Sequence, residues 1–156
     1  MLQTGDRNAN AIARTIEALI GKADPKRYQF SVLFLNDDGE LGDRFRSAGV
    51  RVASAGWSGS LRDAAGAARF AGATRKLEPQ IIHFHAGGAS VRLIARAATG
   101  AKIVAHFHSL RNESGAGRPR STRGADLTVA NSQATAATLK GASPVLSCIS
   151  LFVSQN

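Results

Sequence analysis

The chain has few of the features that mark secreted or membrane-spanning proteins. A single cysteine, Cys148, excludes an intramolecular disulfide and favours a reducing compartment. No apolar run is long enough to span a bilayer, and no apolar segment follows a basic start as in a secretory signal. We therefore expect a cytoplasmic protein, either free or held peripherally at the inner face of a membrane.

Aromatic residues are also scarce, at 6% of the chain, so alanine and glycine must fill many interior positions. This composition favours close packing of helices on a sheet over a core built from large rings. Two nucleotide-binding signatures are missing, because neither Gly-x-Gly-x-x-Gly nor a Walker motif occurs. With 44% hydrophobic residues, the 156-residue chain can still bury the core of one domain.

Acidic residues number 11 against 20 lysines and arginines, which leaves a net charge of +9. Such an excess favours an anionic partner, such as a nucleic acid, a phospholipid head group or a phosphorylated substrate. The positive charge is scattered, and its densest segment, residues 111–123, equally suits a solvated loop. No DNA-reading helix or aromatic-rich sheet surface is recognisable, so we expect no nucleic-acid partner.

Two hydrophobic periods alternate along the chain, one typical of strands and one of helices. Strands are expected at residues 2–5, 30–35, 50–53, 80–84, 101–107, 125–130 and 144–153, and helices at residues 11–20, 41–48, 61–77, 89–98 and 132–139. Asn8 or Asn10 is the expected N-cap of the first helix. The order predicts an α/β fold in which residues 1–156 form a single Rossmann-like domain, a parallel sheet with helices on both faces.

All four histidines lie in two copies of one pattern, His83–His85 and His106–His108, and each copy closes an expected strand. Alternation along a strand places the two histidines of a copy on one face. They could chelate a metal, form a rim that binds a ligand or transfers a proton, or be satisfied by backbone groups at the strand ends. No nearby carboxylate or cysteine completes a metal shell. We therefore favour the ligand-binding rim, expect no metal, and regard His83 and His106 as the structural members.

Other residues that follow expected strands are weaker candidates, because ligands in such folds bind beyond the carboxyl ends of the strands. Gly87 and Gly88 open a helix, where backbone N–H groups can approach an anion. Gly5 lies between a strand end and a helix, and Asn131 follows a later strand. Trp57 stands among glycine and serine; it is compatible with a surface contact and is assigned no role.

Taken together, the segments resemble the acceptor-side domain of family 4 retaining glycosyltransferases, which have the GT-B fold. The resemblance rests on the order and spacing of Leu2–Asp6, Asp37–Leu41 with Ala48–Val52, Ile81–Gly88, Val104–Ser109 and Ala125–Ser132. It implies an enzyme that transfers a sugar from a nucleotide-sugar to a glycan or lipid-linked acceptor with retention of configuration. It also implies no cofactor beyond the donor itself, which is a substrate.

The resemblance assigns roles to particular residues. His108 matches the family's histidine that contacts the sugar near the reacting centre, which makes it the candidate catalytic residue. His85 matches the histidine at the end of the preceding strand, and Gly5 matches the loop that approaches the donor phosphates. Gly87, Gly88 and Asn131 complete the expected substrate-binding set.

The chain also departs from the family pattern. The two glycines usual near Asn8 and Ala9 are absent, the first strand is nearly missing, and so is the C-terminal donor-binding domain. We therefore expect a domain truncated at both ends and inactive alone, with an unpaired sheet edge that favours a homodimer. The alternatives are a non-catalytic basic module that docks on an anionic membrane or partner protein, and a sugar-phosphate epimerase of the same fold.

Overall fold

The computed structural model describes residues 7–108, 120–140 and 144–147. The chain divides into two compact units, residues 1–78 and residues 79–156. Both units consist of parallel strands with helices between them, which confirms the Rossmann-like α/β class. Among the described residues, no helix is both long enough and apolar enough to cross a bilayer.

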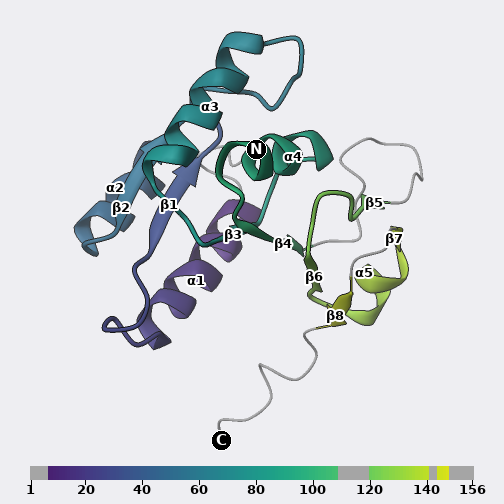
Figure 1. Ribbon diagram of the computed structural model, residues 1–156. Coiled ribbons are helices and arrows are strands. Elements are labelled where there is room, and N and C mark those ends of the chain that lie inside the picture. The colour runs from purple at the N-terminus through teal and green to yellow at the C-terminus, as the bar shows by residue number, and fades with distance from the viewer. Residues whose placement is uncertain (1–6, 109–119, 141–143, 148–156) are drawn as a thin grey trace, which may run out of the picture. The chain divides into compact units, whose positions relative to one another are not determined.

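The N-terminal unit is built around one parallel strand pair. Its elements are α1 (Arg7–Lys22), β1 (Ser31–Phe34), α2 (Gly39–Ser47), β2 (Arg51–Ser54) and α3 (Ala64–Lys76) (Figure 1). The register places Ser31 beside Arg51 and Phe34 beside Ser54, with α2 as the crossover between the strands. The core of this unit consists of Ala13, Phe34, Leu41, Phe45 and Val50.

Two expectations for this unit were wrong, and one residue left unassigned proves to be buried. Helix α1 begins at Arg7, so Asn8 and Asn10 lie inside the helix rather than at its N-cap. Helix α3 begins only at Ala64, because the Asp63 carboxylate accepts a hydrogen bond from the Gly66 N–H at 2.7 Å and caps it there. Trp57 is fully buried, its ring centroid 5.3 Å from that of Phe70.

Gly66 allows this close packing, and its replacement provides a sharp test. A Cβ on Gly66 would collide with the Asp63 carboxylate and with the Trp57 ring, whereas a Cβ on Gly72, in the same helix, would meet nothing within 4 Å. We expect Gly66→Ala to lower the free energy of unfolding by ~1–3 kcal/mol, because overpacking forces neighbours apart. Gly72→Ala should raise it by ~0.5–1 kcal/mol, because alanine is the better helix former.

Urea denaturation followed by the fluorescence of Trp57, the single tryptophan, measures both variants in the unit that contains them. Equal midpoints for Gly66→Ala and Gly72→Ala would show that the space at Gly66 is not limiting.

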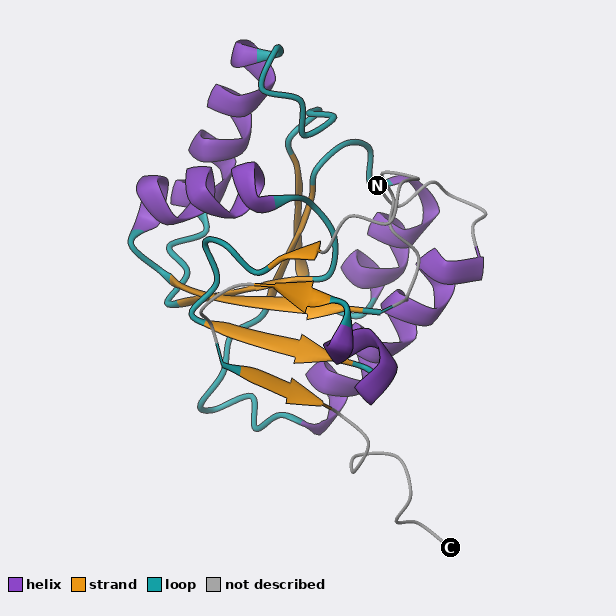
Figure 2. Cartoon of the chain, turned by 90° about the vertical axis from the view of Figure 1, so that its right-hand side faces the viewer, coloured by secondary structure: helices purple, strands orange, loops and turns teal. Residues whose placement is uncertain are grey.

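The C-terminal unit contains a four-stranded parallel sheet in the order β3-β4-β6-β8 (Figure 2). The elements are β3 (Ile81–Phe84), α4 (Ala89–Thr99), β4 (Lys102–Phe107), β5 (Arg120–Ser121), β6 (Leu127–Ala130), α5 (Gln133–Ala137), β7 (Leu139–Lys140) and β8 (Val145–Ser147). Strands β5 and β7 form a separate parallel pair. Because the four strands run in one direction, the carboxyl ends of β3, β4 and β6 lie at one edge of the sheet.

Local signals predicted the end of α4 and the start of α5, but the helix expected at residues 132–139 is shorter, because α5 ends at Ala137 and Leu139–Lys140 forms strand β7. Helix α4 stops at Gly100, which has a φ of 71° in the left-handed region. The Ser132 hydroxyl caps α5 by accepting a hydrogen bond from the Thr135 N–H at 3.1 Å. The predictions for residues 2–5, 111–119 and 148–153, Cys148 among them, lie outside the described residues.

Candidate functional site

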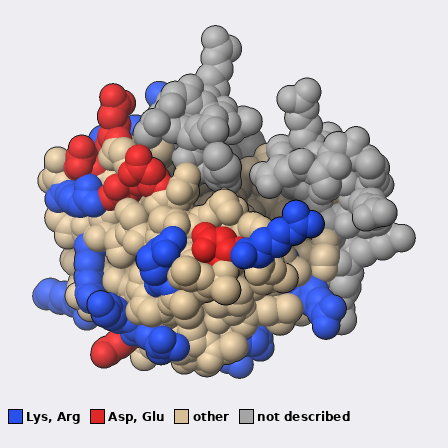
Figure 3. All heavy atoms as spheres, turned by 90° about the horizontal axis from the view of Figure 1, so that it is seen from above, with Lys and Arg blue, Asp and Glu red and all other residues tan. Residues whose placement is uncertain are grey.

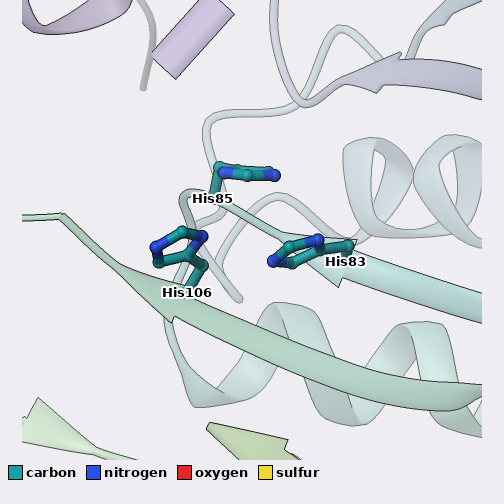
Figure 4. Close-up of side chains that lie close together, drawn as sticks. All are labelled: His83, His85 and His106. Atoms are coloured by element: carbon teal, nitrogen blue, oxygen red, sulfur yellow. The ribbon is translucent and has the colours of Figure 1, made fainter. Parts of the chain in front are cut away.

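The register between β3 and β4 brings the two His-Phe-His copies together. His83 pairs with Val104 and Phe84 with Ala105, so the next step along the strands sets His85 beside His106. The ring centroids of His85 and His106 are 5.3 Å apart, and those of His83 and His106 are 5.4 Å apart (Figure 4). Phe84 is buried, as expected for the residue that points to the opposite face. The expectation that both copies meet at one rim is confirmed.

His108 extends this row of imidazoles. Its ring centroid lies 3.9 Å from that of His106. The Nε2 atom of His108 and the Nδ1 atom of His85 form a hydrogen bond of 2.9 Å. The two histidines that the family resemblance selects are therefore in direct contact.

Asn131 holds the backbone of this rim. The register of β4 and β6 sets Phe107 beside Ala130, and the Asn131 N–H donates to the Phe107 carbonyl at 3.2 Å. Its side-chain Nδ2 donates to the His108 carbonyl, and its Oδ1 accepts from the Thr135 hydroxyl at 2.9 Å. In this structure the Asn131 side chain therefore positions His108, while its expected role in substrate binding stays a prediction.

The glycines after β3 form the start of α4. Gly88 is the N-cap residue and has extended backbone, and Gly87 has a φ of 91°, which only glycine adopts readily. The Gly87 carbonyl accepts a hydrogen bond from Nη1 of Arg92 at 3.2 Å. Arg92 could not be singled out from the sequence, because nothing in its local pattern separates it from the exposed arginines. Gly5 lies outside the described residues.

The inner histidines differ from what the sequence predicted. The Nε2 atom of His83 and the Nδ1 atom of His106 are buried and have no hydrogen-bond partner within the described part of the chain. The expectation that backbone groups satisfy both rings is therefore wrong for these atoms. Ring nitrogens of His83, His85 and His106 lie within 4.8 Å of one another. The register of β3 and β4 brings these rings together, but the described residues do not supply a hydrogen-bond partner for every ring nitrogen.

Burial also sets the charge of the cluster. It lowers the pKa of His83 from 6.5 to about 4, with a smaller contribution from His106. Burial, followed by the neighbouring histidines, lowers the pKa of His85 to about 2, and burial lowers the pKa of His106. These three rings are therefore neutral at pH 7. A neutral imidazole offers one N–H and one lone pair, so the rim can hydrogen-bond hydroxyl groups or bind a metal.

Comparison with known proteins identifies the family. Residues 12–146 match the family model described as Glycosyltransferase Family 4. The match extends from α1 to β8 and includes all four histidines. No curated protein and no solved structure matches the chain. Since the family model covers most of the sequence, the chain belongs to glycosyltransferase family 4.

Proposed function

We propose that the chain forms the acceptor-side domain of a GT-B glycosyltransferase that moves a sugar from a nucleotide-sugar to a glycan or lipid-linked acceptor. His108 contacts the sugar near the reacting centre, and His85 supports it. The observation that carries this proposal is the 2.9 Å hydrogen bond between these two rings at adjacent strand ends, within a chain of this family.

The chemistry of the rim agrees with such a role. A retaining transfer through an oxocarbenium-like state requires precise positioning and stabilisation of the leaving phosphate more than a strong base. Neutral imidazoles suit hydrogen bonds with sugar hydroxyls. Backbone N–H groups at Gly87 and Gly88, at the start of α4, supply donors suited to an anion. No cofactor other than the donor is part of this proposal.

The positive charge supports a further proposal about location. On the face shown in Figure 3, lysine and arginine side chains are spread among acidic ones rather than gathered in one patch. Some of the arginines are paired, as in the contacts of Arg44 with Glu17 and of Arg96 with Asp126. We infer a cytoplasmic domain that touches anionic membrane only peripherally, either as a monomer or as a homodimer, with no nucleic-acid partner.

Titration of the ¹⁵N-labelled chain with UDP- and GDP-sugars, followed in amide NMR spectra, tests the proposed function. We expect resonances of His85, Gly87 and His108 to shift with at least one nucleotide-sugar, while those of Thr15 and Arg75, in the other unit, stay in place. His108→Gln should weaken that binding by ~3- to 10-fold, the value of one lost hydrogen bond.

A chain that ignores every nucleotide-sugar would refute the proposed contact of His108 with the donor sugar in this domain. If it then also sedimented with anionic vesicles but not with neutral ones, the docking-module alternative would take its place.

A further inference from the structure

The rings of His83, His85 and His106 lie together at the rim, and the proposed function uses only His85 of the three. His83 lies in β3, His85 directly follows β3, and His106 lies in β4. Figure 4 shows the three rings facing one another, and one ring nitrogen from each lies within 4.8 Å of the other two. No carboxylate or cysteine belongs to this group among the described residues.

In two of these rings, one nitrogen atom has no hydrogen-bond partner among the described residues. The Nε2 atom of His83 and the Nδ1 atom of His106 are buried without a hydrogen bond in the described structure. A buried polar atom left unsatisfied costs ~1–3 kcal/mol, and native folds keep few of them. An electrophile bound between the rings would satisfy lone pairs on both.

The distances suit a metal ion after small side-chain rotations. Zinc binds imidazole nitrogen at about 2.0–2.1 Å, so three ligands of a tetrahedral ion lie about 3.3 Å from one another. The three nitrogens now lie within 4.8 Å of one another. Moving each of them by about one ångström, through rotation about the side-chain torsions, would bring them to the distances of metal ligands. Three imidazoles with no oxygen ligand favour zinc or a related transition metal over magnesium or calcium.

The hydrogen bond between His85 and His108 fits the surroundings of a metal ligand. A histidine bound to a metal usually hydrogen-bonds through its other ring nitrogen, which fixes the tautomer and the ring orientation. The Nδ1 atom of His85 has such a contact, with Nε2 of His108 at 2.9 Å. When Nδ1 of His85 carries the proton, its Nε2 atom holds the lone pair that a metal needs.

We propose that His83, His85 and His106 together bind one zinc-class transition-metal ion, with His108 as a positioning residue for His85. The sequence-based expectation of no metal relied on the lack of a carboxylate or cysteine beside each His-Phe-His copy. The strand register removes that objection, because it supplies the third imidazole from the neighbouring strand. The site shares His85 and His108 with the proposed function, but it is argued from the geometry of the three rings and not from sugar binding.

The test uses a chain without a polyhistidine tag, freed of metal with EDTA and titrated with zinc chloride in a calorimeter. We expect one zinc ion per chain and no binding of magnesium or calcium. His83→Gln and His106→Gln should each weaken zinc binding by more than about 100-fold, and His108→Gln by ~10- to 100-fold. Asp43→Asn, whose side chain is 78% exposed, should leave binding unchanged.

Imidazole ¹⁵N spectra of the unaltered chain keep the proposal testable if the variants fail to fold. Zinc should shift the ring resonances of His83, His85 and His106 together. Absence of zinc binding, or ring resonances that ignore bound zinc, would overturn the proposal. The proposal would also be overturned if the His83→Gln and His106→Gln variants bound zinc as tightly as the unaltered chain does. A chain that binds zinc through these rings but binds no nucleotide-sugar would refute only the proposed function.

Discussion

Replacing Arg92 by methionine should lower the free energy of unfolding of the C-terminal unit by ~3–5 kcal/mol. The Arg92 side chain is buried, with 2% of the residue exposed, although it carries a charge. Its Nε atom donates to the Arg123 carbonyl at 3.1 Å, Nη1 to the Gly87 carbonyl at 3.2 Å, and Nη2 to the Ser121 carbonyl at 2.7 Å. One guanidinium thus joins the loop after β3 to the segment before β6. Methionine fills similar volume but leaves three carbonyls without these donors.

Two further variants separate this effect from a general effect of removing charge. Arg92→Lys keeps the charge, but a single ammonium lacks the planar fork that reaches three carbonyls, so it should restore only part of the stability. Arg75→Met, on the exposed surface of α3, should change stability by less than ~0.5 kcal/mol. Urea titration monitored by amide NMR measures each variant in the unit that contains it, the C-terminal unit for Arg92 and the N-terminal unit for Arg75. Arg92→Met and Arg75→Met variants of equal stability would contradict the role of Arg92.

The sequence predicted those features that depend on local chemistry. Hydrophobic period, the glycine at the end of α4 and the serine before α5 are local signals, and they located the helices, although the period began α3 and ended α5 two or three residues too far out. The two-residue strands β5 and β7 were missed, because two residues carry no period. Trp57 was left unassigned for a related reason: its glycine and serine neighbours are compatible with a surface, but Phe70, on a helix further along the chain, packs against it.

In the candidate site, too, some features follow from the local sequence and others depend on residues distant in the chain. Alternation within one strand predicted that His83 and His85 share a face, and the ring centroids are 4.3 Å apart. That His85 lies beside His106 depends on the register of two strands, which no local pattern specifies. Whether a ring nitrogen finds a partner depends on everything packed around it, so the unsatisfied atoms of His83 and His106 were beyond sequence reasoning. Arg92 was missed because its burial, rather than its spacing, makes it unusual.

Acidification should destabilise the C-terminal unit between pH 6.5 and pH 4 in the absence of metal. In the fold, burial holds the pKa of His83 near 4, and it holds the pKa of His85 lower still, whereas both titrate near 6.5 when unfolded. Below pH 6.5 the unfolded chain therefore binds more protons, and stability falls as the pH falls. Each histidine contributes up to ~1.4 kcal/mol per pH unit, so His83 alone accounts for as much as ~3 kcal/mol by pH 4.

The N-terminal unit serves as an internal control, because it contains no histidine. A hydrogen bond from Arg96 lowers the pKa of Asp126 below 3.8. Burial raises the pKa of Asp38, but the hydrogen bond and the charge of Arg46 outweigh it and lower that pKa as well. Both carboxylates therefore lose their stabilising charge only at pH values below the histidine window. Urea titrations in EDTA, read residue by residue from amide spectra at a series of pH values, should show midpoints that fall for the sheet of the C-terminal unit and stay level for α2 and α3. His83→Gln should reduce the pH slope by about one proton. A C-terminal unit equally stable at pH 7 and pH 4.5 would mean that the rings of His83 and His85 take up protons without penalty, as solvated histidines do.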